Sequence, residues 1–166
     1  MDKRAIAAAF ATVLISVGGA AASNELVLVT GDQILNRAAI AIEGNDNRLT
    51  ITQEHTGGGG LNAIAATIRG DLNGGPLGAT FTGAARLAGL EPGTLTQRGF
   101  NNTMAIEVEG NANLFAFAQV GSGNMLQASI TGHANQAAVF QEGMNNFASF
   151  SQHGIGNIVS ITQHSW

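Results

Sequence analysis

Four histidines are the residues that could most readily bind a metal ion or transfer a proton. They are His55, His133, His153 and His164. A metal site needs several nitrogen, sulfur or carboxylate ligands that meet at one point, but the chain has no cysteine and no carboxylates clustered with these histidines. His153 and His164 stand eleven residues apart, at the same place in successive repeats, so we expect them on opposite sheets. We therefore predict no metal site.

The sequence gives no more support for catalytic chemistry than for a metal site. The serines are spread along the chain without a positioned histidine and aspartate, which nucleophilic catalysis requires. Gly57 to Gly60 is not followed by the Gly-Lys-Ser/Thr of a phosphate-binding loop. We expect no catalytic residue, no cofactor and a protein that is not an enzyme.

Asparagine and glutamine supply the remaining chemistry, which is hydrogen bonding between side-chain amides that recur at a fixed spacing. From Asn102 to Asn157 the asparagines are eleven residues apart without a break, and earlier pairs have the same spacing. Glycines recur in the same frame, eight residues after most of the asparagines. The predicted asparagine ladder is Asn36, Asn47, Asn62, Asn73, Asn102, Asn113, Asn124, Asn135, Asn146 and Asn157, and the predicted turn glycines are Gly44, Gly70, Gly99, Gly110, Gly121, Gly132, Gly143 and Gly154.

Each repeat has the pattern of one strand and one turn. Apolar residues or glutamines alternate with small or polar residues, and this period of two predicts a β-strand of about six residues. Met104, Ile106 and Val108, for example, alternate with Ala105 and Glu107. The Gly-x-x-Asn that follows favours a tight turn, because glycine and asparagine tolerate positive φ.

We count twelve repeats, with starts near residues 25, 36, 47, 62, 73, 91, 102, 113, 124, 135, 146 and 157. Irregular loops interrupt them near residues 55–61 and 74–92, and the spacing is most regular over residues 91–166. One strand cannot bury its own apolar face, so two repeats are expected to form one coil of 22 residues.

Glutamines support the 22-residue coil. Gln97, Gln119, Gln141 and Gln163 are each 22 residues apart, so in stacked coils they would form a ladder with a step of about 4.8 Å. Buried amides then satisfy one another and fix the register. We assign Gln53 and Gln152, which stand at the same place in other repeats, to the glutamine ladder as well. The predicted fold is all-β, a two-sheet β-solenoid of about six coils.

The N-terminus predicts a Sec signal peptide over residues 1–22, followed by the repeat domain over residues 23–166. Lys3 and Arg4 precede a mostly apolar stretch from Ala5 to Val17, and Ala20-Ala21-Ala22 forms a small-residue cleavage site. No second apolar stretch is long enough to span a bilayer, which takes about 20 residues. We expect no stable membrane insertion and a secreted protein.

Charge is scarce in this chain. Only 11% of residues are charged, against about 25% in typical soluble domains, and low charge reduces repulsion between copies. The net charge of −4 excludes a nucleic-acid partner. Glu107, Glu109 and Glu142 are the only formally charged residues from Gly99 to Trp166.

The repeat from Asn113 to Asn124, Asn-Leu-Phe-Ala-Phe-Ala-Gln-Val-Gly-Ser-Gly-Asn, resembles the curlin repeat, as do the two repeats that begin at Asn135 and Asn146. Curlin proteins are subunits of curli, the amyloid fibres of bacterial surfaces. The resemblance implies export through Sec and the periplasm, then an outer-membrane curli secretion pore. It also implies polymerisation with copies of itself or another curlin subunit into a cell-surface fibre that serves biofilm matrix and adhesion.

Two other functions remain open from the sequence. The first is a minor, nucleator-like subunit that templates a partner subunit. The second is a monomeric β-solenoid that binds a surface, which would need outward rows of threonine; we expect Thr50 and Thr52 to be followed in their sheet by Glu107 and Gln127. We also expect the repeat from Asn157 to Trp166 to be a growth surface. A flat outward face for lateral packing of filaments is expected from Ala39, Ala41, Ala65, Ala116, Ala118, Ala138 and Phe140.

Overall fold

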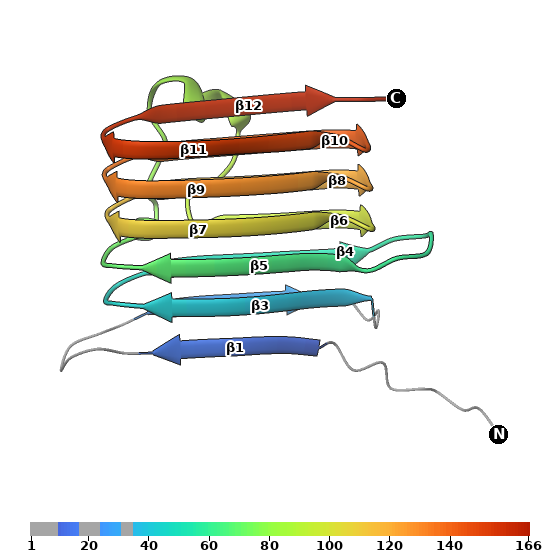
Figure 1. Ribbon diagram of the computed structural model, residues 1–166, viewed down its shortest axis with the longest axis horizontal. Helices are drawn as coiled ribbons and strands as arrows, with labels where there is room; N and C mark the ends of the chain where they lie inside the picture. The colour runs from blue at the N-terminus through green and yellow to red at the C-terminus, as the bar shows by residue number, and fades with distance from the viewer. Residues whose placement is uncertain (1–9, 17–23, 31–34) are drawn as a thin grey trace.

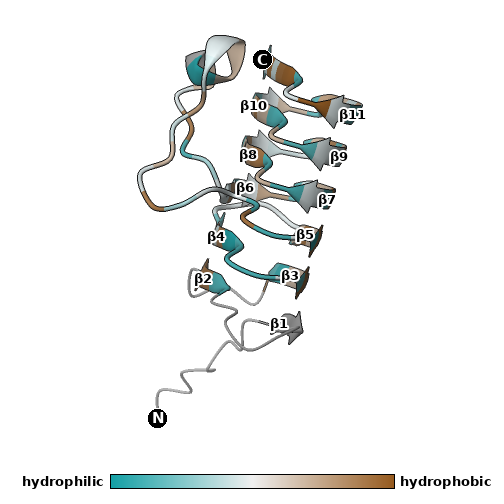
Figure 2. Cartoon of the chain, turned by 90° about the vertical axis from the view of Figure 1, so that its left-hand side faces the viewer, coloured by the Kyte–Doolittle hydropathy of each residue, from teal (hydrophilic) through white to brown (hydrophobic). Residues whose placement is uncertain are grey.

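Two parallel β-sheets face each other and wind into a solenoid (Figures 1 and 2). The structure is a computed structural model of the chain and describes residues 10–16, 24–30 and 35–166. Sheet A contains β1 (Phe10–Ser16), β3 (Asn36–Glu43), β5 (Asn62–Arg69), β7 (Thr103–Asn111), β9 (Met125–His133) and β11 (Phe147–Ile155). Sheet B contains β2 (Glu25–Thr30), β4 (Arg48–His55), β6 (Thr94–Phe100), β8 (Leu114–Ser122), β10 (Gln136–Met144) and β12 (Ile158–His164).

Successive strands lie on opposite sheets, and each pairs in parallel with the strand two places along the chain. Gln119, for example, lies between Gln97 and Gln141 in register. The prediction of an all-β, two-sheet β-solenoid of about six coils is therefore confirmed. Among the described residues, no helix is long and apolar enough to cross a membrane.

Strand β1 lies inside the segment assigned to the signal peptide and pairs with β3. The rest of residues 1–22 lies outside the described residues, so removal of this segment stays a prediction. A chain that begins at Ser23 would keep eleven strands, five in sheet A and six in sheet B.

The core lies between the sheets and is built by alternation along each strand. In β3 the residues Ala38, Ile40 and Ile42 are buried, while Arg37 and Glu43 on the other face are exposed. Large side chains in the middle of the stack meet small ones: Phe115 and Phe117 are fully buried with ring centroids 6.1 Å apart, and Ala128 and Ala137 are buried in the same cluster. Full burial of one such side chain contributes about 2 kcal/mol, so this shared core holds the coils together.

The turn glycines are required by the close stacking of coils. Gly121 has φ +112°, and a Cβ there would lie 2.0 Å from the carbonyl oxygen of Gly143 in the next coil. The corresponding glycines from Gly44 to Gly143 show the same approach to the next coil, whereas Gly154, in the last turn of sheet A, does not. Because positive φ directs a side chain along the stacking axis here, only glycine lets the turns stack at strand spacing.

Residues 74–92 form an excursion that leaves the stack and returns to the same point. Gly74 donates a hydrogen bond to the carbonyl of Asn113, and Gly93 donates one to the carbonyl of Phe115. Between them the chain crosses the outer face of sheet B and forms the 3-10 helix η1 (Gly83–Ala88), which lies against β10 and β12 (Figure 2). Phe81 and Ala85 are buried on this face against Ala116 and Ala138.

This excursion corrects the count of repeats. The repeats expected at residues 73 and 91 are one repeat, because Asn73 provides its asparagine and β6 (Thr94–Phe100) provides its strand. Glu91 lies in the excursion and does not occupy a position in the asparagine column. Merging two repeats moves the N-terminal half of the chain to the opposite sheet from the one expected. Thr50 therefore neighbours Thr94, and Thr52 neighbours Thr96, rather than Glu107 and Gln127.

The expected lateral face is also corrected. Ala116 and Ala138 are fully buried under the excursion, and Ala118 is 5% exposed. This part of sheet B is therefore covered by the chain's own residues and is not a flat, open face. The same alanines end the threonine rows, since Ala116 follows Thr94 and Ala118 follows Thr96.

Substitution of Gly121 by alanine should destabilise the fold by about 3 kcal/mol, because strain at positive φ adds to a clash with a neighbouring backbone. Gly156→Ala is the matched control: Gly156 also has positive φ, +69°, but no atom lies within 4 Å of its Cβ position. It should cost about 1 kcal/mol. Urea unfolding of freshly purified chain, followed by circular dichroism, measures both values. Equal losses would contradict the role assigned to turn stacking.

Candidate assembly interface

Asparagine side chains form two columns that run along the stack, one at the start of each sheet's strands. The sheet A column is Asn36, Asn62, Asn102, Asn124 and Asn146, and the sheet B column is Asn24, Asn47, Asn73, Asn113, Asn135 and Asn157. In both columns Nδ2 of each asparagine donates to Oδ1 of the preceding one, at 2.9–3.2 Å. Each of the ten asparagines predicted from the repeat lies in one of these two columns.

Most of the asparagine oxygens also accept a backbone hydrogen bond. The Oδ1 of Asn102, for instance, accepts from both the backbone N–H and the Nδ2 of Asn124, each at 3.1 Å. The other amide hydrogen of most asparagines is donated to a turn glycine, as from Asn102 to the carbonyl of Gly121 at 2.9 Å. Most of these amides are fully buried. A slip of one coil by one residue would leave these polar groups without partners, at a cost of about 1–3 kcal/mol each.

Glutamines form a third column inside sheet B. Nε2 donates to Oε1 of the next glutamine toward the C-terminus, at 2.8–2.9 Å, along Gln53, Gln97, Gln119, Gln141 and Gln163. The same Nε2 donates across the core to a sheet A carbonyl, as from Gln119 to Thr103 at 3.0 Å. The glutamine column therefore links the coils along the stack and the two sheets across it.

Two residues differ from their expected places. Gln152 lies in sheet A beside Ile130 and is not part of the glutamine column. Its Nε2 donates to the carbonyl of Gln136, but its buried Oε1 has no hydrogen-bond partner. Asn24 was missed because the repeat frame pointed to Glu25; it begins the sheet B column by accepting from Asn47. An asparagine directly before the first strand was the signal that could have identified it.

Opposite charges are stacked in the N-terminal half of the solenoid. Arg69 of β5 lies within 3.4 Å of Glu43 in β3 and of Glu107 in β7, and Arg98 lies 2.8 Å from Glu54. All these groups are about half exposed, so each pair contributes little, about 0–1 kcal/mol. These ion pairs therefore favour pairing with the correct strand but add little to the stability of the fold. In the C-terminal half the amide columns select the neighbouring strand.

The stack ends in open strand edges. β12 and β2 are the edge strands of sheet B, and β11 is the C-terminal edge of sheet A. No residue of β12 is fully buried, and its sequence Ile-Val-Ser-Ile-Thr-Gln-His contains no Asp, Glu, Lys or Arg. The one helix in the described ranges, η1, lies on the outer face of sheet B against β10 and β12, and no described strand pairs with the free side of β12. Open edges with unpaired backbone groups can pair with another strand.

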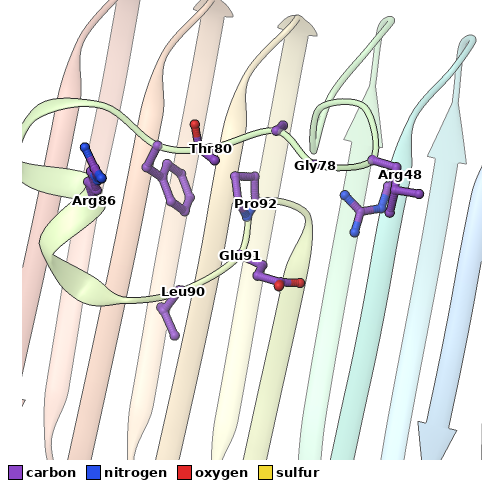
Figure 3. Close-up of a pocket in the computed structure, with 10 residues that line it drawn as sticks. Arg48, Gly78, Thr80, Arg86, Leu90, Glu91 and Pro92 are labelled. Atoms are coloured by element: carbon purple, nitrogen blue, oxygen red, sulfur yellow. The ribbon is translucent and has the colours of Figure 1, made fainter.

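A shallow pocket of about 420 Å³ lies between the two limbs of the excursion, with Arg48 at one side (Figure 3). Its side chains, among them Phe81, Leu90 and Pro92, offer no pair of groups that could act together as acid and base. His164 Nδ1 lies 3.1 Å from Glu142 and His55 Nε2 lies 3.1 Å from the carbonyl of Gly60. No three His, Cys, Asp or Glu residues of the described segments come together as a metal site would require.

The geometry defines the class of this protein: a parallel β-solenoid whose coils are joined by columns of buried amides. Residues 132–164, which contain β10, β11 and β12, match the family model described as Curlin associated repeat. The resemblance to curlin repeats is thereby confirmed for that segment. No curated protein and no solved structure matches the chain. The repeat and the fold fit a subunit of a curli-like amyloid fibre.

Replacement of Gln119 by leucine should lower the free energy of unfolding by about 3 kcal/mol, because the amide of Gln97 and the carbonyl of Gln141 would lose their partners. Gln127→Leu is the control: Gln127 is exposed on sheet A, and its replacement should change stability by less than about 0.5 kcal/mol. Urea unfolding midpoints of the two variants measure the difference. If Gln119→Leu unfolds at the same urea concentration as the parent chain, the column does not stabilise the stack.

Proposed function

We propose that this protein is a structural subunit of an extracellular, curli-like amyloid fibre. Copies exported through Sec and an outer-membrane secretion pore, after loss of residues 1–22, stack end to end so that the two sheets continue from one copy into the next. The fibre serves adhesion and biofilm matrix. The observation that carries this proposal is the pair of open sheet edges at the ends of a stack whose amide columns are built for repetition.

Physical reasons favour a polymer over a monomeric binding module. Every buried Asn and Gln in the middle of a column is satisfied by the coil on either side, so a further coil would satisfy the terminal ones in the same way. Natural solenoids that stay monomeric usually cover their end coils with caps. A surface-binding module would also use a regular outward row, and here the threonine rows end at Ala116 and Ala118, which are buried.

A nucleator-like role is the second candidate, and the difference between the two ends favours it. The C-terminal edge carries the last members of all three amide columns, whereas Thr30 stands at the N-terminal edge beside Gln53. An end with complete columns is the better template for a partner subunit. Addition of preformed seeds of this chain to another curlin subunit tests this role, since a nucleator shortens the lag of its partner while a pure structural subunit seeds chiefly itself.

Deletion of residues 157–166 should lengthen the lag phase and slow the growth of fibres, because it removes the edge strand β12 and the last asparagine and glutamine of the sheet B columns. Deletion of residues 57–60 is the control. It shortens the spacing from Asn47 to Asn62 from fifteen residues to the regular eleven and leaves both edges intact, so fibre growth should persist.

Thioflavin fluorescence, electron microscopy and fibre diffraction with a reflection near 4.8 Å measure the outcome. A parent chain that stays a dye-negative monomer at high concentration would refute the proposed function. Unchanged kinetics after deletion of residues 157–166 would refute the role of β12 as a growth edge.

A further inference from the structure

We propose that copies join head to tail through one junction, in which β12 of one copy pairs in parallel with β2 of the next, with Ser160 beside Val27, while sheet A is left with a space one strand wide between β11 and β3. This inference rests on the proposed function and specifies which surfaces meet. It follows from the direction of the hydrogen bonds in the columns, from the exposed residues of β2 and from the number of strands in each sheet.

The asparagine columns have a direction. Each Oδ1 accepts from the asparagine that follows it toward the C-terminus, as Asn135 accepts from Asn157 at 3.0 Å and 3.1 Å. At the C-terminal end, the Oδ1 atoms of Asn146 and Asn157 are therefore acceptors with no further asparagine above them. At the N-terminal end, Asn24 presents a backbone N–H and an Nδ2 toward an absent neighbour. In the proposed junction, the donors of Asn24 therefore meet the Oδ1 acceptor of Asn157 in the sheet B column.

The glutamine column runs in the opposite direction. Each Nε2 points toward the C-terminus, so Gln163 ends the column with an amide that donates only to the carbonyl of Phe147. In the proposed register the hydroxyl of Thr30 lies next to that amide, because Thr30 occupies the glutamine place in β2. Two C-terminal ends would oppose acceptor to acceptor in the asparagine columns and donor to donor in the glutamine column, and two N-terminal ends would oppose the asparagine donors of one Asn24 to those of the other. The columns therefore exclude head-to-head contacts and select head-to-tail ones.

The outer face of β2 is apolar and open. Val27 is 40% exposed and Val29 is 52% exposed. Continuing the register of sheet B places them beside Ser160 and Thr162 of the preceding copy. There they would also approach η1, which stands beside β12 at the C-terminal end of the stack (Figure 1). No Asp, Glu, Lys or Arg occurs in β12, so Glu25 of the incoming β2 meets no like charge there.

The strand count creates the space in sheet A. β2 lies beside β3 at one end, whereas β12 stands one step above β11 with no sheet A strand opposite it (Figure 2). When β12 and β2 of successive copies are direct neighbours, β11 and the next β3 are therefore two strand spacings apart, about 10 Å. In the full chain, β1 occupies the place next to β3 and would fill this space. After loss of residues 1–22 it would be open.

Engineered disulfides test the junction, and the chain has no cysteine of its own. Ser160→Cys and Val27→Cys are made as separate variants, carry different tags, and are mixed before assembly and oxidised in the fibre. Neighbouring in-register strands place their Cα atoms about 4.8 Å apart, within the range of a disulfide. Cross-linked heterodimers should therefore dominate, in the full chain and in a chain that begins at Ser23 alike.

Matched pairs make the test specific. Ser160→Cys with Val29→Cys, displaced by two residues along the strand, would need a span of about 8 Å, beyond the disulfide limit of about 7 Å. Ser149→Cys with Ala39→Cys occupies the same outward place in sheet A and would have to span the one-strand space. Both pairs should give several-fold less heterodimer than Ser160→Cys with Val27→Cys.

The outcomes separate the two proposals. Absence of fibres in the parent chain refutes the proposed function and, with it, the junction. Fibres in which Ser149→Cys links to Ala39→Cys, or in which Ser160→Cys links mainly to itself, overturn the junction but leave the fibre function standing. Fibres without any link between Ser160→Cys and Val27→Cys also overturn the junction and leave the fibre function standing.

Discussion

The buried side-chain amide, satisfied only by its equivalent in the neighbouring coil, is the constraint on which the rest of this structure depends. An amide that is removed from water without a partner costs about 1–3 kcal/mol. Here three columns of such amides run through the stack, and each inner member both donates to one neighbour and accepts from the other. The apolar core between the sheets supplies most of the stabilisation but would tolerate a slip of two residues, which keeps the same faces buried. The amides would not tolerate it, and they therefore choose one register.

This constraint explains where the chain can be irregular. The excursion of residues 74–92 enters directly after Asn73, and the residues from Gly57 to Gly60 enter between His55 and Asn62. The residues from Gly57 to Gly60 lie in a turn and the excursion lies between Asn73 and the start of β6, so neither insertion displaces a glutamine of the column. Because Asn73 keeps its bonds to Asn47 and Asn113, an insertion that is longer than a whole repeat leaves the column continuous.

The same constraint links the fold to the proposed assembly. A column of hydrogen bonds with one direction ends in acceptors on one side and donors on the other, and its end members lie at open strand edges. In the described residues, Arg–Glu pairs such as Arg98 with Glu54 join strands from β2 to β7 only, where they favour correct neighbours within the chain. Residues 132–164, which match the curlin repeat, contain no Lys or Arg, and there the amide columns select the neighbouring strand. An uncharged edge of this kind can receive another copy without like-charge repulsion.

The sequence by itself determined the local structure: the period of two along Met104, Ile106 and Val108 indicated strands, the recurring Gly-x-x-Asn indicated the turns, and the 22-residue spacing of four glutamines indicated the coil. These features are local or strictly periodic, so they can be read along the chain. Only the tertiary structure decided which sheet the N-terminal half occupies, because Glu91 to Gly99 imitates a repeat of its own while Asn73 supplies the asparagine. It alone showed that Ala116 and Ala138 lie under the excursion and that Gln53 lies beside Gln97. Those facts depend on contacts between residues far apart in the chain, where an insertion changes which strands become neighbours without changing the pattern within any of them.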